Sequence, residues 1–257
     1  MHIFVISLER SIERRSALCA RLRSLGLSAE IFPAIDGASL APDQAHYDGR
    51  RRRLLYGKDM TSGEIGCARS HVAVCTEIVR RNLSGAIVLE DDAILADHLP
   101  AAITALSGAA DKWDLVRFLG SEKNLRLMRR VNDLGNGFAL TRIYGTPGGA
   151  YGYALNRRAA QRLARCGATT WMPIDTLHGQ VWRHGLRVRG LIPSPALPDY
   201  VVPSTIGSER FSKVPRLAGW ERAVFPVTRY AFKLWDAAMK KGTFWLGLVK
   251  DRLHREH

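Results

Sequence analysis

Three carboxylates follow one another at the end of an apolar run of strand type. The run is Ala86-Ile87-Val88-Leu89, and Glu90, Asp91 and Asp92 come directly after it. Ligands collect at the carboxyl ends of strands in α/β proteins. Because neighbouring carboxylates repel one another, we expect a cation beside them, and a divalent ion that bridges nucleotide phosphates prefers oxygen ligands. A polar strand end followed by a turn is the alternative.

The chain is long enough for one large domain, or for one domain with an appendage, and it is strongly basic. It has 257 residues and a formal net charge of +14. Nucleic acid, an anionic membrane surface and a highly phosphorylated substrate are all compatible with that charge. The sequence has no zinc-finger, bZIP or aromatic RNA-binding motif, so we expect no nucleic-acid partner.

The sequence predicts a cytosolic protein that is soluble or peripheral to a membrane. Residues 1–8 are apolar but have no basic leader, and no apolar stretch approaches the roughly 20 residues of a membrane span. Four cysteines without a C-x-x-C pair fit a reduced compartment. Cys67, His71 and Cys75 do not suit zinc, because eight helical residues place the two thiols about 12 Å apart along the axis.

Strands and helices alternate from the N-terminus, which predicts an α/β sheet with parallel crossovers. Residues 38–62 are expected to form a loop with a solvated run of arginines at 50–53, and residues 120–148 an irregular segment. The predicted strands are residues 3–8, 29–34, 86–90, 114–119 and 148–155, and the predicted helices are residues 10–25, 62–82, 157–166 and 173–184.

The chain changes character near residue 214, so we divide it into a domain at 1–211 and a basic amphipathic helical extension at 212–257. Residues 210–257 contain 11 Lys and Arg against 4 Asp and Glu, mixed with Trp and Phe. Such a helix suits the interface of an anionic membrane. A helix packed on the domain or on a second subunit is the alternative.

Three sequence blocks follow one another in the first 92 residues. The blocks are Val5-Ile6-Ser7-Leu8-Glu9-Arg10-Ser11 with Glu13-Arg14-Arg15, Gly63-Glu64-Ile65-Gly66-Cys67-Ala68-Arg69-Ser70-His71, and Val88-Leu89-Glu90-Asp91-Asp92. They resemble glycosyltransferase family 25, the bacterial enzymes of lipooligosaccharide synthesis and their collagen-galactosylating relatives. Their order and spacing carry the resemblance, which extends over roughly residues 1–207 and includes Pro173-Ile174-Asp175 and Pro203-Ser204-Thr205-Ile206.

The resemblance implies a GT-A-like α/β fold, with a mainly parallel central sheet flanked by helices, and a UDP-sugar donor that often carries galactose. It places Glu90, Asp91 and Asp92 at the metal-binding acidic motif. We expect Mn²⁺ or Mg²⁺ there, with Asp92 as the first direct ligand, Glu90 as the second and Asp91 in contact with ribose. Ser7 stands where the family commonly has Asn, so a side-chain contact at that position would differ.

Charge accumulates on the leaving phosphate when a nucleotide sugar reacts, so cationic side chains near it lower the barrier. Arg10, Arg14 and Arg15 follow the first predicted strand, although Arg14 and Arg15 also fit a solvated surface. Glu64 has a second interpretation too, because an acid at the start of a helix favours the helix dipole. The predicted donor-binding residues are Ser7, Leu8, Arg10, Arg14, Glu64, Glu90 and Asp91.

Asp175 and His71 are the predicted catalytic residues. If the reaction inverts the anomeric centre, a carboxylate must accept the proton of the attacking hydroxyl, and Asp175 follows Met172-Pro173 at a predicted helix start. An ordinary acid at a helix N-terminus is the alternative, and Asp199 is a weaker second acid. His71 would position the donor or the acidic motif, or else be a buried structural histidine.

Together these observations predict a metal-assisted, inverting glycosyltransferase at the cytoplasmic face of the inner membrane. It would move a hexose, with galactose as the first candidate, from a UDP-sugar to a lipid-linked oligosaccharide such as a lipopolysaccharide core. The alternatives are another metal-dependent transferase of nucleotide substrates, and a non-catalytic basic protein that binds membranes or nucleic acid.

Overall fold

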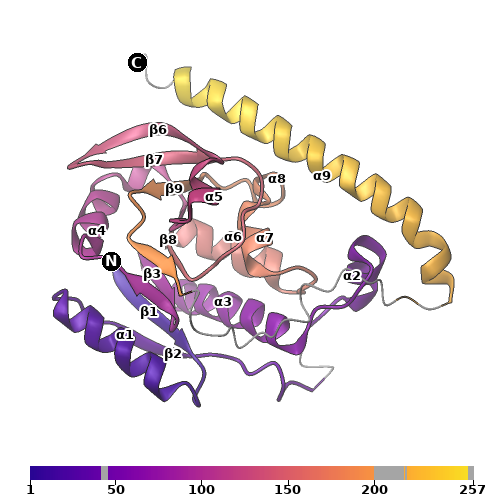
Figure 1. Ribbon diagram of the computed structural model, residues 1–257, viewed down its shortest axis with the longest axis horizontal. Helices are drawn as coiled ribbons and strands as arrows, with labels where there is room; N and C mark the ends of the chain where they lie inside the picture. Colours follow the sequence, from indigo (N-terminus) through magenta and orange to yellow (C-terminus); the bar gives the residue numbers. More distant parts are fainter. Residues whose placement is uncertain (42–45, 200–216, 218, 254–257) are drawn as a thin grey trace.

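An eight-stranded sheet lies between two layers of helices, and a long C-terminal helix runs along the outside (Figure 1). The computed structural model describes residues 1–41, 46–199, 217 and 219–253. The strands are β1 His2–Ser7, β2 Glu30–Pro33, β3 Gly85–Glu90, β4 Ala93–Leu95, β5 Leu115–Arg117, β6 Met128–Gly135, β7 Phe138–Ile143, β8 Gly152–Asn156, β9 Val188–Ile192 and β10 Ala196–Pro198. The helices are α1 Ile12–Ser24, α2 Gly49–Tyr56, α3 Ser62–Arg80, α4 Leu99–Gly108, α5 Glu122–Leu125, α6 Arg157–Gly167, α7 Ile174–Gly179, α8 Val181–His184 and α9 Trp220–Leu253, with a 3-10 turn at Ala110–Lys112.

The strand order of the large sheet is β2-β1-β3-β8-β5-β9-β7-β6. Pairing is parallel within β2-β1-β3 and between β5 and β9, and β8 and β7 pair antiparallel with both of their neighbours. Six of the eight strands therefore point the same way. The predicted α/β class is confirmed, and the arrangement is compatible with a GT-A-like fold.

Alternating apolar residues in β1 explain why helices cover both faces of the sheet. Phe4 and Ile6 belong to a core with α3, α6 and α7, whereas Ile3 and Val5 belong to a second core with α1 and α4. Side chains alternate between the faces of a strand, so a continuous apolar run requires cover on both sides. This arrangement leaves the carboxyl end of β1 as the place where polar side chains can gather.

The arginine run is helical, which corrects the prediction of a loop at residues 38–62. Asp48 begins α2 by accepting a hydrogen bond from the backbone N–H of Arg51, and Gly57 ends it with a φ of 83°. A helix turns each successive side chain by about 100°. Arg52 is therefore buried and stacks on Tyr56, whereas the other three arginines of the run are not buried.

Two further segments differ from expectation. Residues 120–148, predicted to be irregular, contain the hairpin β6–β7, whose turn holds Asn136 at φ 51° and Gly137 at φ 81°. Asn-Gly is the favoured pair for such a turn, a signal that the sequence interpretation missed. The single helix expected at 173–184 is two short helices, because Gln180 has a ψ of 64° and interrupts it.

The helical C-terminal extension is confirmed, and α9 packs against the rest of the chain. Glu221 forms a two-pronged ion pair with Arg53 of α2, at 2.8 Å for both Nε–Oε2 and Nη2–Oε1. At the other end, Asp251 contacts Arg142 at 2.7 Å and Arg189 at 2.8 Å. The proposed boundary between residues 211 and 212, and the block at 203–206, lie outside the described residues.

In the part of the chain that the structure describes, no helix is long and apolar enough to cross a membrane. All four cysteines are free thiols.

Candidate functional site

A cavity opens at the carboxyl ends of β1 and β3, where the sequence placed the donor site. Its wall combines the end of β1, the start of α1, the loop after β2, one side of α3 and the acidic motif. The lining residues are Ile6, Ser7, Leu8, Arg10, Ser11, Arg14, Ala34, Ile35, Asp36, Gly37, Gly63, Cys67, Ser70, His71, Glu90, Asp91 and Asp92. We call this the acidic cavity. It contains every predicted donor-binding or metal-ligating residue except Glu64.

Two glycines allow the loop after β2 to lie directly on α3. A Cβ atom on Gly66 would meet the backbone nitrogen of Gly37 at 2.5 Å and the carbonyl oxygen of Ile35 at 2.6 Å. Both contacts are with backbone, which cannot move aside as a flexible side chain can. Ser70, one turn further along α3, accepts a hydrogen bond from the backbone N–H of Ile35 at 2.8 Å. The loop is thereby fixed as one wall of the acidic cavity.

Glu64 caps the helix that carries His71. Its carboxylate accepts a hydrogen bond from the backbone N–H of Thr61 at 2.8 Å, and the Thr61 hydroxyl accepts one from the Glu64 N–H at 3.2 Å. This reciprocal pair satisfies two N–H groups that a helix start leaves unpaired. The structural interpretation of Glu64 therefore accounts for its contacts, and the side chain does not line the acidic cavity.

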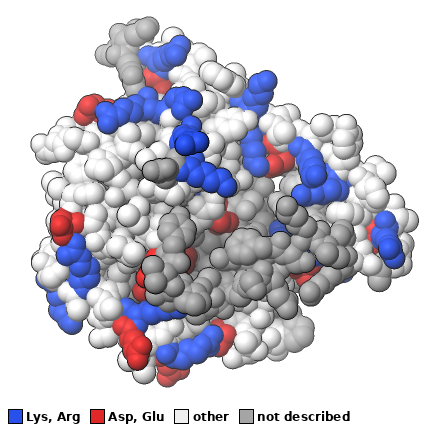
Figure 2. Space-filling model, in the orientation of Figure 1, with Lys and Arg blue, Asp and Glu red and all other residues white. Residues whose placement is uncertain are grey.

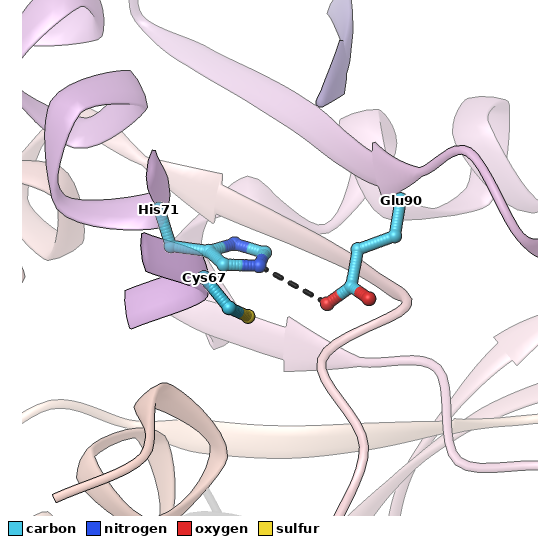
Figure 3. Close-up of side chains that lie close together, drawn as sticks. All are labelled: Cys67, His71 and Glu90. Atoms are coloured by element: carbon cyan, nitrogen blue, oxygen red, sulfur yellow. Dashed lines mark hydrogen bonds and ion pairs between the residues drawn. The ribbon is translucent and has the colours of Figure 1, made fainter. Parts of the chain in front are cut away.

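His71 is buried and links the acidic motif to the core. Its Nε2 lies 3.1 Å from Oε1 of Glu90, as Figure 3 shows, and its Nδ1 lies 2.9 Å from the hydroxyl of Tyr153. A neutral ring with its proton on Nε2 satisfies both contacts, donating to Glu90 and accepting from Tyr153. Tyr153 sits on β8 beside Val88 of β3. His71 therefore holds the Glu90 carboxylate in place.

Asp91 and Asp92 have different surroundings. The hydroxyl of Ser7 donates a 2.7 Å hydrogen bond to Oδ2 of Asp91, so this serine contacts the acidic motif. Burial raises the pKa of Asp91, and the Ser7 bond and the charge of Arg14 oppose that rise. Burial, followed by the charges of Glu90 and Asp91, raises the pKa of Asp92 to about 7.

The acidic motif fits a divalent cation. Oδ1 of Asp92 is buried and has no hydrogen-bond partner among the described residues. A buried carboxylate oxygen without a partner, beside two more carboxylates, is stabilised when a cation contacts it. Asp92 and Glu90 supply the oxygen ligands that Mn²⁺ and Mg²⁺ prefer.

A second set of possible ligand atoms also includes Glu90. The Sγ of Cys67, a ring nitrogen of His71 and a carboxylate oxygen of Glu90 all lie within 4.8 Å of one another (Figure 3). A thiolate with an imidazole suits zinc, not Mn²⁺ or Mg²⁺. However, burial raises the pKa of the Cys67 thiol well above its usual value, and the charges of Glu90 and Asp175 raise it further. Without a metal the thiol is therefore protonated, and an ion bound at this set would have to displace that proton.

Asp175 belongs to the same acidic region, although it does not line the cavity. It lies in the first turn of α7, as expected, and its Oδ2 accepts a 3.1 Å hydrogen bond from the backbone N–H of Gly149. Gly149 has a φ of 96°, which favours glycine. The charges of Glu90 and Asp175 both raise the pKa of the Cys67 thiol, so both carboxylates lie near that thiol.

Comparison with known proteins identifies the family. The family model described as "Glycosyltransferase family 25 (LPS biosynthesis protein)" matches residues 1–178. The chain belongs to glycosyltransferase family 25. This match covers both strands that end at the acidic cavity, the helix that carries His71, and Asp175, and it ends before α9.

Three relatives within glycosyltransferase family 25 are animal proteins. A glycosyltransferase 25 family member of Aedes aegypti is 34% identical over 46% of this chain and 21% of its own length. Procollagen galactosyltransferase 1 of Danio rerio is 28% identical over 67% of this chain and 30% of its own length. An inactive glycosyltransferase 25 family member 3 of Homo sapiens is 30% identical over 47% of this chain and 22% of its own. The chain thus spans about a fifth to a third of the relatives it matches.

Sequence reasoning missed Arg117, a fully buried arginine beside this family 25 site. Its Nη2 donates a 2.6 Å hydrogen bond to the carbonyl oxygen of Gly149, the residue whose N–H contacts Asp175. Burial lowers the pKa of Arg117, and the charge of Asp175 opposes that change. The signal was a lone arginine inside the apolar run Leu115-Val116-Arg117-Phe118-Leu119. Tyr153 was missed for the same reason, because the sequence around each of these residues is typical of a buried core strand.

Proposed function

We propose that this protein transfers a hexose, with galactose as the first candidate, from a UDP-sugar to a hydroxyl of a lipid-linked oligosaccharide. One observation carries the proposal. Oδ1 of Asp92 is buried without a hydrogen-bond partner among the described residues, and it lies in a cavity that Arg10 and Arg14 also line. Carboxylates that hold a divalent ion, together with arginines, are what a nucleoside diphosphate requires. Membership of family 25 supports the same chemistry.

In the proposed mechanism, Asp92 and Glu90 would hold Mn²⁺ or Mg²⁺, which would supply positive charge to the diphosphate. Asp92 would be the first ligand, and the Nε2–H of His71 orients Glu90. The side chain of Arg14 already acts electrostatically on Asp91 and Asp92, which places its charge beside the acidic motif. The bond from the anomeric carbon to the phosphate oxygen breaks with both electrons on the leaving UDP, and the arginines that line the cavity stabilise that charge.

Asp175 is the proposed general base of an inverting reaction. The acceptor hydroxyl attacks the anomeric carbon, the new carbon–oxygen bond forms, and the hydroxyl proton passes to the Asp175 carboxylate. The N–H of Gly149 holds Oδ2, and the Thr176 N–H contacts Oδ1 at 2.6 Å. Arg117 acts as a positioning residue because it fixes the carbonyl of Gly149.

The proposed place of action is the cytoplasmic face of an anionic inner membrane, reached through α9. Large apolar side chains of this helix are exposed, among them Val227 at 71%, Leu246 at 67% and Trp245 at 57%. Figure 2 shows Lys and Arg side chains at intervals along the edge where Figure 1 places α9. Exposed rings beside cations suit the headgroup level of anionic lipid.

The experiment is UDP release from a panel of UDP-sugars, with UDP-galactose first, measured with Mn²⁺ and with EDTA. We expect release from one sugar, dependent on the metal and absent in Asp92→Asn. Heat of donor binding is measured in parallel, so that a missing acceptor is distinguished from a missing donor site.

Two results would overturn the proposal. If no UDP-sugar is bound or gives UDP release, the acidic motif is a polar strand end followed by a turn, and not a donor site. Release of pyrophosphate in place of a nucleoside diphosphate would favour a nucleotidyltransferase. The relatives named inactive make a non-catalytic protein a concrete rival, in which Asp92→Asn leaves membrane or nucleic-acid binding unchanged.

A further inference from the structure

A second concave surface lies between α2, α9 and the segment from Trp171 to Arg183. Its volume is about 880 Å³, and it is separate from the acidic cavity. The described residues that line it are Asp48, Arg50, Arg51, Leu54, Leu55, Trp171, Gln180, Trp182, Arg183, Thr228, Phe232 and Trp235. We call this the aromatic groove. Nothing in the activity proposed above uses it.

The groove has more cationic than anionic groups. The guanidinium carbons of Arg51 and Arg183 lie 4.1 and 5.0 Å from the centre of the Trp171 ring, so two cations share one indole. Asp48 is the one carboxylate among the described lining residues, and one of its oxygens accepts the backbone N–H of Arg51. Two guanidinium groups held together on a ring attract a phosphate, which accepts their N–H groups in pairs.

The same wall presents N–H donors that lack acceptors. Nε1 of Trp171, Nε1 of Trp182 and Nε2 of Gln180 are buried and have no hydrogen-bond partner among the described residues. Gln180 is only 2% exposed and Trp171 only 4%. Buried donors without partners are costly unless a ligand satisfies them. An acceptor such as a phosphate or hydroxyl oxygen satisfies donors of this kind.

Flat aromatic faces supply the rest of the surface. Trp182 and Trp235 meet edge to face at 5.9 Å, and Phe232 lies 6.1 Å from Trp235. The negative face of an indole attracts the weakly positive C–H groups of a sugar ring, whereas an acyl chain needs no N–H donors. Sugar rings with an attached phosphate therefore match this groove better than a lipid tail does.

The groove also lies within reach of the proposed general base. Trp171 precedes Asp175 by four residues, which an extended chain spans in at most about 14 Å. Gln180 follows Asp175 by five residues, along a helix that rises about 1.5 Å per residue. A saccharide of a few units held in the groove can thus present one hydroxyl near Asp175.

We propose that the aromatic groove is the acceptor subsite, and that the acceptor is a phosphorylated oligosaccharide. This inference rests on the proposed glycosyltransferase function. The phosphate contacts Arg51 and Arg183, the sugar rings stack on Trp182 and Trp235, and the buried donors contact oxygen atoms of the ligand. The groove thereby selects anionic acceptors.

The experiment measures binding of the full chain to a panel of disaccharide 1-phosphates, headed by lactose 1-phosphate, against lactose and against inorganic phosphate. We expect the phosphorylated disaccharide to bind at least about tenfold more tightly than either part alone, since one guanidinium–phosphate pair corresponds to roughly a tenfold effect. The double variant Arg51→Gln, Arg183→Gln should bind the phosphorylated disaccharide no more tightly than lactose. Arg162→Gln, an exposed arginine of α6 outside the groove, is the matched control.

Additional variants separate binding from folding. Arg51→Lys with Arg183→Lys keeps the charge and should bind with intermediate strength, because lysine lacks the planar fork. Trp182→Leu should weaken the sugar contribution, and Trp182→Phe should restore part of it. Thermal melting of each variant confirms that it is folded.

The two proposals fail in different ways. Donor binding to the acidic cavity, measured with UDP alone, should be equal in the wild type and the groove variants. If UDP binds while no phosphorylated disaccharide does, or while the double variant binds it as well as the wild type, the acceptor inference is wrong. If the double variant loses only binding to phosphatidylglycerol vesicles or to an oligonucleotide, the groove serves a membrane or a nucleic acid and the inference is again wrong. Intact phosphosaccharide binding without UDP binding would overturn the proposed function and, with it, the assignment of the groove to an acceptor, and would leave only a phosphosaccharide-binding site.

Discussion

The acidic cavity and the aromatic groove differ in how their residues are distributed along the chain. The cavity gathers residues 6–92, from two strand ends, the start of α1, the loop after β2 and one side of α3. The groove joins α2 to residues 171–183 and to α9, so its members are separated by as many as 187 positions, from Asp48 to Trp235. Local motifs determine the first region, and long-range packing creates the second.

Their electrostatics are opposite as well. In the acidic cavity, burial and neighbouring carboxylates raise the pKa of Asp92 to about 7. A bound cation would stabilise the charged carboxylate and lower that pKa. In the groove, burial and the charge of Arg51 lower the pKa of Arg183. A bound anion would stabilise the charged guanidinium and raise that pKa. The segment carrying α7 and α8 contributes Asp175 near one region and Trp182 to the other. This comparison leads to four predictions, of decreasing effect.

Asp92→Asn should have the largest effect. We expect kcat for UDP release to fall between about 10³- and 10⁴-fold, because the charge that a metal ion supplies to a leaving group is worth several kcal/mol. Steady-state kinetics at saturating Mn²⁺ measure it, and the matched variant Arg162→Gln serves as control. A decrease of less than about tenfold would remove Asp92 from the metal site.

Asp175→Asn should reduce transfer by about 10³-fold, in the middle of the range that general-base catalysis contributes. The amide still accepts a hydrogen bond from the Gly149 N–H, so the loop stays in place. Affinity for UDP should not change, because this residue does not line the acidic cavity. Equal losses in donor binding and transfer would show that Asp175 supports the fold and is not the base.

Asp251→Asn tests whether α9, one wall of the groove, depends on its ion pairs. Asp251 is 13% exposed and compensates both Arg142 and Arg189, the latter 5% exposed. We expect the free energy of unfolding to fall by about 3 kcal/mol, since removing one partner leaves buried charge uncompensated. Urea unfolding measures the change. Affinity for the phosphosaccharide should fall more than affinity for UDP. A larger loss of UDP affinity would show that the acidic cavity and the aromatic groove do not depend on separate parts of the fold.

Stability should fall as the pH decreases from 7 to 5, through the histidine that holds α7 and α8 together. His184 accepts a hydrogen bond from the Leu186 N–H, and its Nε2 contacts the carbonyls of Leu177 and His178. Burial lowers its pKa from 6.5 to about 4. The unfolded state therefore binds more protons between these values, and the stability present above pH 6.5 is lost below it.

The loss from this one group between pH 7 and pH 5 should be about 2 kcal/mol. Urea unfolding of the wild type and of His184→Gln at both pH values measures it. The variant lacks the titrating ring but keeps a donor, so its stability should change less with pH. An equal change in both proteins would show that His184 is not the source. His178, whose pKa burial also lowers, would then be the next candidate.

Much of the acidic cavity could be predicted because each residue carries a local signal. The apolar run of β3 and the acids after it identify a strand end, whatever the rest of the fold does. The distance of 19 positions between His71 and Glu90 is bridged by one helix–strand connection, so the two were expected to lie close. The helix at 49–56 was missed because four consecutive arginines indicate a solvated loop until burial of Arg52 against Tyr56 is known.

The sequence by itself determined the alternation of strands and helices, the position of the carboxylates and the amphipathic character of the last helix. These properties follow from periodicity and from residue type over short stretches. Only the tertiary structure decided that α9 packs against α2, that Arg51 and Arg183 share one indole, and that Arg117 supports the loop beside Asp175. The physical reason is that burial and charge pairing between distant segments depend on how the chain packs, and no local pattern contains that information.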